Sequence, residues 1–479
     1  MTYNLLREPW IPVLRHDGMF LRLGIIDALS QAHLIREIAS SNPMDRVAIF
    51  RLLLSILYWC KGNPTPKLQD ASASAFPPDW FSRLDEHSDW FNLLGDGTRF
   101  YQHRVSGSPV PNPSPLPSTY LAEEVPTGTN IAHFCHSRDY NDGLCCACCA
   151  KGLVRLPAFA TQGGKGKSPG INQAPPLYQL PERHSLAHSL RASWKAWPTL
   201  GTPAWVQPDI TPPSKGEVPL LVGLTWLPRA VWLSDPDEPE ATCIACGRTE
   251  RLIRTCVFAG LGSRKAQSPT PGAAWADPHV IYVQSGKSGK AALRAADVLD
   301  SFSSAFADWA RLAQALLADA GPDERRARVV GFSTGQAKYR EATEWLLPMP
   351  STTAQRVEHR EYVLQWWKEG SRLWAEVLPP ARPRWKKGRP VKYYKATFAQ
   401  VRPHLEYAAF AGLGSPGFGE IWWKQVEGSC TPMMIAIAGA LYPEPTAASL
   451  RERMRIESIR PKPPKQQAEA KDTSRNDTH

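Results

Sequence analysis

Two short cysteine motifs, far apart in the sequence, constrain the fold of this chain more than any other feature. The segment "LCCACCAKG", residues 144–152, holds four of the chain's ten cysteines, and "TCIACGR", residues 242–248, supplies a further C-x-x-C pair. Zinc prefers four thiolates in a tetrahedron with bonds of about 2.3 Å, and each C-x-x-C turn directs two thiolates toward one point. The two motifs therefore predict a closed, structural zinc site that pins two distant loops together.

The first motif leaves the choice of ligands open. Cys145 with Cys148 and Cys146 with Cys149 both have the C-x-x-C spacing, and the residues alone do not choose between them. A cytosolic redox protein is a further alternative for such pairs. Neither motif follows a strand and opens a helix in a clear βαβ pattern, which argues against a thioredoxin-like pair. Isolated cysteines are better explained as buried small apolar side chains, namely Cys60, Cys135, Cys256 and Cys430.

Composition narrows the class of protein. The chain has 479 residues, 43% of them hydrophobic, which is enough for several domains with substantial cores. Its 56 Lys and Arg exceed its 45 Asp and Glu, and the net charge of +11 favours a polyanionic partner. The N-terminus does not have the pattern of a signal peptide, and the longest apolar run, 433–442, is far short of the ~20 residues of a membrane helix. We expect a cytoplasmic protein without a membrane partner.

The N-terminal part mixes helical and irregular patterns. Asn42-Pro43 followed by "MDRVAIFRLLLSILYWC" has the cap and the apolar periodicity of a buried helix. The stretch 198–240 alternates prolines with the strand-like segments "PLLVGLTWLP" and "AVWL". After Gly289 an apolar helical stripe runs to Gly321-Pro322, and a short strand "RVVGF" and a loop "STGQAKYR" are expected next.

The C-terminal part is predicted to be helical. Its helical segments are 353–378, 395–411, 427–442 and 447–458. The sequence thus predicts an α+β fold with a large, irregular mixed N-terminal domain that contains the zinc site, followed by a C-terminal four-helix bundle. The expected boundaries are 1–350 for the N-terminal domain, 351–460 for the bundle and 461–479 for a polar, disordered tail.

Motifs of catalysis are not matched. "GKS" occurs at 166–168 and 286–288, but Thr161 and Ile281 occupy the place of the leading glycine that a phosphate-binding P-loop requires. Neither a nucleophile elbow, G-x-S-x-G, nor a zinc-protease motif, H-E-x-x-H, is present. A nucleotide-hydrolysing enzyme or a hydrolase therefore has little support.

Two segments are suited to contact a nucleic-acid backbone. "QGGKGKSPG", residues 162–170, combines glycines, whose amides can approach a phosphate or a groove closely, with Lys165 and Lys167. The segment 381–402 has eight Lys or Arg, no acidic residue and four interleaved aromatic residues. A flexible linker and a solvated inter-helix loop are the respective alternatives. The backbone contacts expected of the two segments are Lys167, Arg384, Lys386, Lys387, Arg389 and Lys392.

The order of several segments resembles one protein family. These segments are "NLLREPWIPVLR", "TGTN", "LCCACC", the glycine-rich loop, "PAWVQP", "LTWLPRAVWL", "CIACGR" and the "AW-DPH" segment at 274–279. Together they resemble the CasA family, the large subunit of the type I-E CRISPR Cascade complex, over nearly the whole chain to about residue 460.

The resemblance implies a non-catalytic role in RNA-guided defence. Members of this family recognise the protospacer-adjacent motif in double-stranded target DNA, start unwinding and R-loop formation, and recruit a helicase-nuclease. The implied partners are the backbone, small, handle-binding and crRNA-processing subunits of the complex and the 5′ handle of the crRNA. A stand-alone, zinc-braced DNA-binding or repair protein that acts without guide RNA is the alternative.

The resemblance also implies which residues read the motif. Gly163, Gly164 and Lys165 align with the family's glycine loop, although Lys165 falls where the family often has a glycine. The family also reads the motif with a lysine and with a glutamine, which are called the lysine finger and the glutamine wedge. The lysine finger corresponds to Lys265 or to the neighbouring Arg264 in "GLGSRKAQ". The glutamine wedge corresponds to Gln336.

The family's first C-x-x-C directly follows a leucine. Leu144 therefore favours Cys145 and Cys148 as zinc ligands, together with Cys243 and Cys246. On this interpretation the zinc site braces the base of the loop that approaches DNA.

Overall fold

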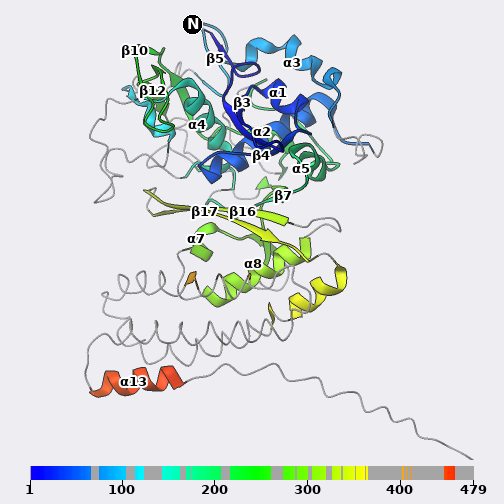
Figure 1. Ribbon diagram of the computed structural model, residues 1–479, viewed down its shortest axis with the longest axis vertical. Coiled ribbons are helices and arrows are strands. Elements are labelled where there is room, and N and C mark those ends of the chain that lie inside the picture. Colours follow the sequence, from blue (N-terminus) through cyan, green and yellow to red (C-terminus); the bar gives the residue numbers. More distant parts are fainter. Residues whose placement is uncertain are drawn as a thin grey trace, which may run out of the picture. The chain divides into compact units, whose positions relative to one another are not determined.

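A computed structural model places the chain in two compact units (Figure 1). The first unit comprises Met1–Leu299 and Asp323–Met349, and the second comprises Asp300–Pro322 and Pro350–His479. The structure describes residues 2–65, 75–103, 114–122, 143–161, 169–172, 174–206, 216–259, 273–285, 289–299, 305–319, 326–335, 338–350, 352–361, 363–364, 402–403, 406, 410 and 447–458.

The first unit is built around helix α2, Pro43–Lys61. The side chain of Asn42 caps it by accepting a hydrogen bond of 2.9 Å from the backbone nitrogen of Met44, and Pro43 occupies the first turn. Gly62 follows the last helical residue as the C-cap, and its φ of +73° favours glycine. Side chains from every face of the helix are buried, as expected for a core helix. The predicted buried helix is confirmed.

Two antiparallel three-stranded sheets lie in this unit. One has the order β3-β2-β4, with β2 at Ile11–Arg15, β3 at Phe20–Leu23 and β4 at Ile35–Ile38. The other has the order β17-β16-β7, with β7 at Tyr178–Glu182, β16 at Arg326–Gly335 and β17 at Lys338–Pro348. The central strand β16 pairs Val329 with Gln179 on one side and with Trp345 on the other.

A third sheet and the cysteine motifs form a neighbouring part of the same unit. Its order is β6-β12-β9, with β6 at Leu116–Pro117, β9 at Ala230–Leu233 and β12 at Thr255–Ala259. A hairpin of β10, Asp237–Thr242, and β11, Thr249–Leu252, carries the second motif, and α4, Cys146–Phe159, carries the first. Helix α4 packs against α2.

The other elements of the first unit are short. Its helices are α1 (Ile25–Ser30), η1 (Pro78–Phe81), α3 (Ser82–Glu86), η2 (Ser88–Phe91), η3 (Ser118–Leu121), α5 (Leu186–Ser193), α6 (Leu220–Thr225) and α7 (Ala295–Leu299). Its two-stranded pairs are β1 (Tyr3–Asn4) with β5 (Asn92–Leu94), β8 (Gly216–Glu217) with β13 (Ala273–Ala274), and β14 (Tyr282–Ser285) with β15 (Gly289–Ala292).

Three local predictions were wrong. The segment "PLLVGLTWLP" contains helix α6 instead of a strand, whereas "AVWL" is strand β9 as expected. Most of "STGQAKYR" belongs to β16 and β17, because pairing across the sheet satisfies the backbone of residues whose side chains are polar. The stripe after Gly289 begins as β15, since that segment pairs with β14, and its described helical residues fall in two helices, one in each unit.

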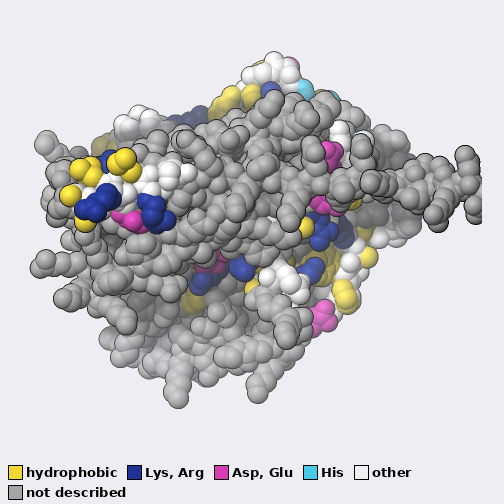
Figure 2. Space-filling view, turned by 90° about the horizontal axis from the view of Figure 1, so that it is seen from below, with side chains coloured by type: hydrophobic (Ala, Val, Ile, Leu, Met, Phe, Trp, Pro, Cys, Tyr) yellow, Lys and Arg dark blue, Asp and Glu magenta, His cyan; other side chains and the backbone are white. Residues whose placement is uncertain are grey.

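The second unit contributes helix α8, Ala305–Asp319, and helix α13, Ala447–Ser458. Residues 353–361 and 363–364 are also helical, and Trp309 of α8 contacts the ring of Phe410 with a centroid distance of 5.6 Å. Figure 2 shows exposed hydrophobic side chains beside basic ones on α13, where Met454 is 68% exposed. The predicted helix 427–442 and the tail 461–479 lie outside the described residues, so the four-helix bundle stays a prediction.

Within the described ranges, each helix is too short or too polar to cross a membrane.

Candidate metal centre and loop base

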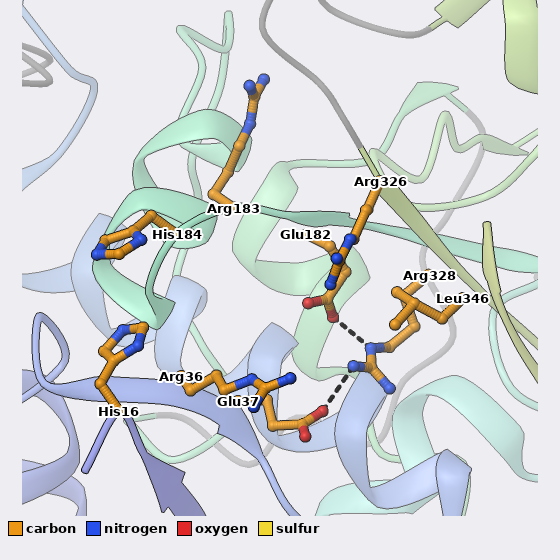
Figure 3. Close-up of a pocket in the computed structure, with 9 residues that line it drawn as sticks. All are labelled: His16, Arg36, Glu37, Glu182, Arg183, His184, Arg326, Arg328 and Leu346. Atoms are coloured by element: carbon orange, nitrogen blue, oxygen red, sulfur yellow. Dashed lines mark hydrogen bonds and ion pairs between the residues drawn. The ribbon is translucent and has the colours of Figure 1, made fainter. Parts of the chain in front are cut away.

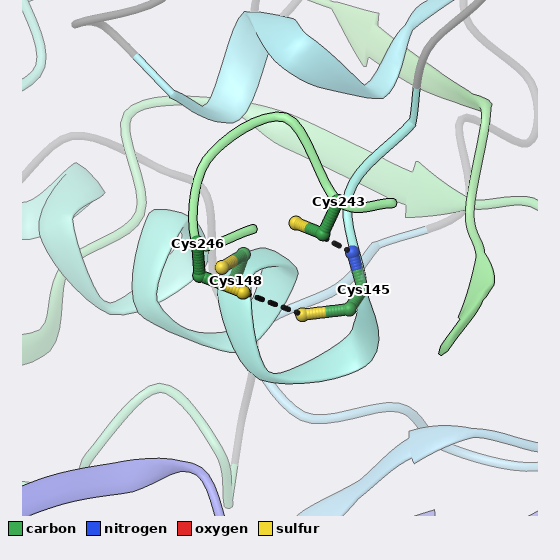
Figure 4. A group of neighbouring side chains, drawn as sticks. All are labelled: Cys145, Cys148, Cys243 and Cys246. Atoms are coloured by element: carbon green, nitrogen blue, oxygen red, sulfur yellow. Dashed lines mark hydrogen bonds between the residues drawn. The ribbon is translucent and has the colours of Figure 1, made fainter. Parts of the chain in front are cut away.

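Four cysteine sulfurs converge at one point of the first unit (Figure 4). The Sγ atoms of Cys145, Cys148, Cys243 and Cys246 all lie within 4.8 Å of one another, and those of Cys145 and Cys246 are 3.7 Å apart. In a tetrahedron with metal–sulfur bonds of about 2.3 Å, neighbouring sulfurs would be about 3.8 Å apart. The four thiols therefore fit a closed tetrahedral metal site.

The second motif supplies its two thiols from a tight turn between β10 and β11. The backbone nitrogen of Cys243 donates to the carbonyl oxygen of Arg248 at 2.7 Å, and that of Gly247 donates to the carbonyl oxygen of Cys243 at 2.8 Å. Gly247 has a φ of +71°, a conformation in which other residues are strained. This turn brings Cys246 back beside Cys243.

The first motif is held against this hairpin by backbone pairing. Leu144 and Ile253 exchange hydrogen bonds of 3.0 and 2.9 Å, and a Cβ at Gly143 would lie 2.6 Å from the Ile253 carbonyl oxygen. Cys145 is the N-cap residue of α4, and its backbone nitrogen donates to the sulfur of Cys243 at 3.3 Å. The motif thus opens a helix, which the sequence pattern did not indicate.

The structure separates the two overlapping pairs of the first motif. Cys146 and Cys149 are also buried, but neither belongs to the four-thiol group. The Cys149 sulfur instead points toward the carbonyl oxygen of Leu144, at 3.9 Å. Because residues one position apart on a helix face different directions, one pair meets the hairpin and the other packs in the core.

One guanidinium and one helix N-terminus lie beside the thiols. Burial lowers the pKa of the Arg22 guanidinium, but its hydrogen bond to Cys246 and the nearby Cys148 outweigh burial and hold that pKa above its usual value. Hydrogen bonds from Cys145 and Cys148 hold the pKa of Cys243 below its usual value. The N-terminus of α4 adds a positive partial charge beside Cys145. A metal with four thiolates carries net negative charge, which these groups would offset.

Helix α4 separates the thiols from the glycine-rich loop. With 14 residues the helix is about 21 Å long, the thiols lie at its N-terminus, and the loop follows its C-terminus. The expectation that the metal site braces the base of the loop was therefore wrong. Asp45 of α2 holds the helix between these ends through ion pairs to Lys151, at 3.0 Å, and to Arg155, at 2.7 Å.

Other residues hold the base of this loop. The backbone nitrogen of Gly170 donates to the carbonyl oxygen of Ala160 at 2.7 Å, which closes the segment between them. Arg229 donates to the carbonyl oxygen of Thr161. A Cβ at Gly170 would lie 2.9 Å from the Pro157 carbonyl oxygen, so only glycine fits without displacement of the backbone.

A buried polar network continues from the loop base into the core. Asn172 donates to Asp277 at 2.9 Å and to the hydroxyl of Tyr178 at 3.2 Å. Asp277 pairs with Arg51 of α2 at 2.5 Å, and both side chains are almost completely buried. The Tyr178 hydroxyl donates to the carbonyl oxygen of Ala158 at 2.7 Å. Sequence reasoning missed this network, although an arginine inside the apolar run "IFRLLLSIL" was a signal that a buried partner exists.

The residues predicted to read DNA lie outside the described part of the chain. They are Gly163, Gly164, Lys165 and Lys167 of the glycine-rich loop, Arg264 and Lys265, Gln336, and the basic residues Arg384, Lys386, Lys387, Arg389 and Lys392. The described flanks of Gln336 are the last residue of β16 and the first of β17, which pair with each other.

Comparison with known proteins gives consistent matches. The model of the family described as CRISPR-associated protein Cse1 matches residues 4–379. The protein "CRISPR-associated protein CasA/Cse1" of Thermus thermophilus is 30% identical over 219 residues, which are 43% of this chain and 43% of that protein. This match thus spans less than half the length of the curated relative.

Solved structures share the fold over nearly the whole length. The crystal structure of Thermus thermophilus CasA is similar with a TM-score of 0.67 and 20% identity, over 95% of this chain and 99% of that one. A chain of a structure described as a CRISPR RNA-guided surveillance complex is similar with a TM-score of 0.68 and 16% identity, over 95% and 99%. The Cse1 crystal structure from Acidimicrobium ferrooxidans has a TM-score of 0.61 and 16% identity, over 95% and 98%.

Proposed function

Because this chain belongs to the CRISPR-associated Cse1 family, also called CasA, we propose that it is the large subunit of an RNA-guided Cascade complex that recognises the protospacer-adjacent motif. The family match over residues 4–379 is the observation that carries this proposal. The similarity to a chain of a surveillance complex supports it. The role is binding and positioning, and the chain would leave cleavage to a recruited helicase-nuclease.

The glycine-rich loop would approach the minor groove of the motif. Gly163 and Gly164 allow close backbone approach, and Lys165 with Lys265 or Arg264 would supply cations in the groove. The closed base at Gly170 and the buried network behind Asn172 support this role, because a loop that reads a groove needs fixed ends. Since the minor groove distinguishes A·T from G·C but carries little orientation information, several related motifs should be accepted.

Strand opening would begin beside the motif. We assign the wedge to Gln336, and its insertion must offset an unstacking cost of a few kcal/mol per base step. Binding to the groove and to the phosphates would supply this free energy. Pairing of the guide RNA with the target strand would then read the sequence itself.

The four-cysteine site would hold a structural zinc ion. Cys145, Cys148, Cys243 and Cys246 would be its ligands, and no coordination position stays open for water. The bound metal would fix the N-terminus of α4 to the β10-β11 hairpin.

We propose the crRNA 5′ handle and the backbone, small, handle-binding and crRNA-processing subunits as the neighbours of the chain in the cytoplasm.

Binding of target duplex by a reconstituted crRNA complex, with and without this chain, tests the proposal. At fixed salt, the complex with the chain should bind cognate DNA more tightly than DNA with a scrambled motif, and the complex without it should not discriminate. If the isolated chain binds both duplexes equally and adds nothing to the complex, a stand-alone DNA-binding protein replaces the Cascade assignment.

Matched variants test the individual residues. Lys265→Ala should reduce discrimination, whereas Lys290→Ala, which removes an exposed lysine of β15, should not. Gln336→Ala should slow strand opening more than it weakens duplex binding, with Gln284→Ala of β14 as the control. If the Lys265 variant discriminates between motifs like the wild type, the lysine finger is assigned to Arg264 instead. If the Gln336 variant loses duplex binding and strand opening equally, Gln336 is not the wedge.

A further inference from the structure

A second polar site lies in the first unit, in a pocket of about 630 Å³ (Figure 3). This volume is within the range of pockets that bind small molecules or nucleotides. Side chains from the β3-β2-β4 sheet, from the β17-β16-β7 sheet and from the turn before α5 line it. The lining residues are His16, Arg36, Glu37, Glu182, Arg183, His184, Arg326, Arg328 and Leu346.

The acidic residues of this pocket all pair with one arginine. Arg328, whose side chain is 7% exposed, forms ion pairs with Glu37 at 2.7 Å, with Glu182 and with Glu344. Arg46 also contacts Glu37 at 3.1 Å and Glu344 at 3.4 Å. Each of these carboxylates is therefore already engaged by Arg328 or by both arginines.

Among the described residues, the other arginines of the pocket have no such partners. Arg36 of β4 and Arg326 of β16 are exposed, and Arg183 is partly buried. No described carboxylate lies within ion-pair distance of any of the three. Arg36 and Arg326 approach the pocket from two different strands, and Arg183 extends toward the top of the view (Figure 3). Four arginines against two glutamates leave the lining with a net charge of +2.

Two histidine rings form one wall of the pocket. His16 and His184 are stacked with a centroid distance of 4.7 Å and an interplanar angle of 17°. Rings of this kind accept a nucleic-acid base by stacking and donate hydrogen bonds to phosphate when protonated. Guanidiniums without a carboxylate partner, next to flat rings, are the features by which proteins hold a single strand.

We propose that this pocket binds a phosphate group of a single nucleic-acid strand, through the guanidiniums of Arg36 and Arg326. The positive charge and the paired rings are properties of the pocket itself, whereas the choice of a strand over a free anion rests on the proposed function. None of the lining residues belongs to the glycine-rich loop, and the site would add a contact that does not read the motif.

Binding of a labelled 12-nucleotide strand to the full chain tests the proposal, with single-stranded DNA and RNA of one sequence as separate arms. The double variant Arg36→Gln/Arg326→Gln should weaken binding about tenfold and reduce the salt dependence by about 0.7 in slope for each phosphate that the variant no longer neutralises. Arg251→Gln, which removes an exposed arginine of β11, is the matched control and should bind like the wild type. The arm in which the double variant loses affinity shows whether the pocket binds DNA or RNA.

A second readout is the titration of His16 by NMR. Burial and the nearby His184 and Arg36 lower the pKa of His16, whereas Asp17 raises it. A bound phosphate would add negative charge, so the strand should raise this pKa in the wild type but not in the double variant. Inorganic phosphate and AMP serve as competitors in the same titration.

Two results would overturn the proposal. One is a double variant that keeps its fold, as judged by thermal unfolding, and binds both strands like Arg251→Gln. The other is a His16 response to inorganic phosphate but to neither strand, which would make this a free-anion pocket. In the reconstituted complex the double variant should keep its discrimination between motifs. Loss of motif dependence in every complex would reject the proposed function and leave the strand-binding result intact.

Discussion

Arg51 and Asp277 lie 226 positions apart in the sequence, yet they form an ion pair of 2.5 Å inside the first unit. The pair connects the central helix α2 to the segment between β13 and β14. Asn172 extends the connection to the residues that follow the glycine-rich loop. One buried contact thus joins the core of the unit to the base of the loop that we assign to motif recognition.

Removal of either partner of this pair should be strongly destabilising. Arg51→Met or Asp277→Leu alone leaves one charge buried without a partner, which typically costs about 3–5 kcal/mol. The double variant removes both charges and should cost less than the sum of the single variants. Urea unfolding measures these values, with Arg7→Met, from an exposed ion pair with Asp85, as the control that changes stability little. If the loss of stability in the double variant equals the sum of the losses in the two single variants, the two side chains do not interact directly.

His279 should make the stability of the chain depend on pH. Burial and the nearby Arg51 lower its pKa to about 3, and neither ring nitrogen has a hydrogen-bond partner among the described residues. The unfolded chain takes up this proton near pH 6.5, so stability is fully present above pH 6.5 and falls as the pH drops toward 3. His279→Leu should flatten the decline between about pH 6.5 and about pH 4.5, measured by urea unfolding. If the variant loses stability with falling pH as steeply as the wild type, other titrating groups cause the decline.

The four-thiol site should retain one zinc ion per chain. Cys243→Ser removes a ligand and should release the metal and lower the melting temperature, because a structural zinc site contributes to folding directly. Cys146→Ser changes a buried thiol outside the group and should keep the metal. Elemental analysis of the purified proteins, with thermal unfolding in the presence of a chelator, gives both results. A wild-type chain that is folded and free of metal would contradict the zinc assignment.

The base of the glycine-rich loop should depend on Gly170. A Cβ there would lie 2.9 Å from the Pro157 carbonyl oxygen, so Gly170→Ala should shift the returning chain and reduce motif-dependent binding several-fold. Gly97→Ala is the control, because a Cβ at that position meets no atom within 4 Å. Duplex binding by the reconstituted complex, on cognate and scrambled motifs, is the measurement. Equal discrimination by both variants would remove Gly170 from the positioning of the loop.

The sequence alone predicted those elements that depend on residues close together in the chain. The Asn42 cap, the proline after it and the apolar periodicity predicted the start and the burial of α2. The C-x-x-C spacing predicted the pairs of thiols, and the order of the segments predicted the family. The residues expected to contact DNA remain predictions, since they lie outside the described part of the chain.

Only the tertiary structure decided which groups meet. The family resemblance had favoured Cys145 and Cys148, and the structure brings this pair to Cys243 and Cys246, because the pairing of Leu144 with Ile253 turns one face of α4 toward the hairpin. It made "LLVGLT" a helix and extended β16 and β17 through polar residues. It also placed the thiols at one end of α4 and the base of the glycine-rich loop at the other. Caps, spacing and periodicity act within a few residues, whereas the pairing of Arg51 with Asp277 and of Arg328 with Glu37 depends on how segments more than a hundred positions apart pack around one core.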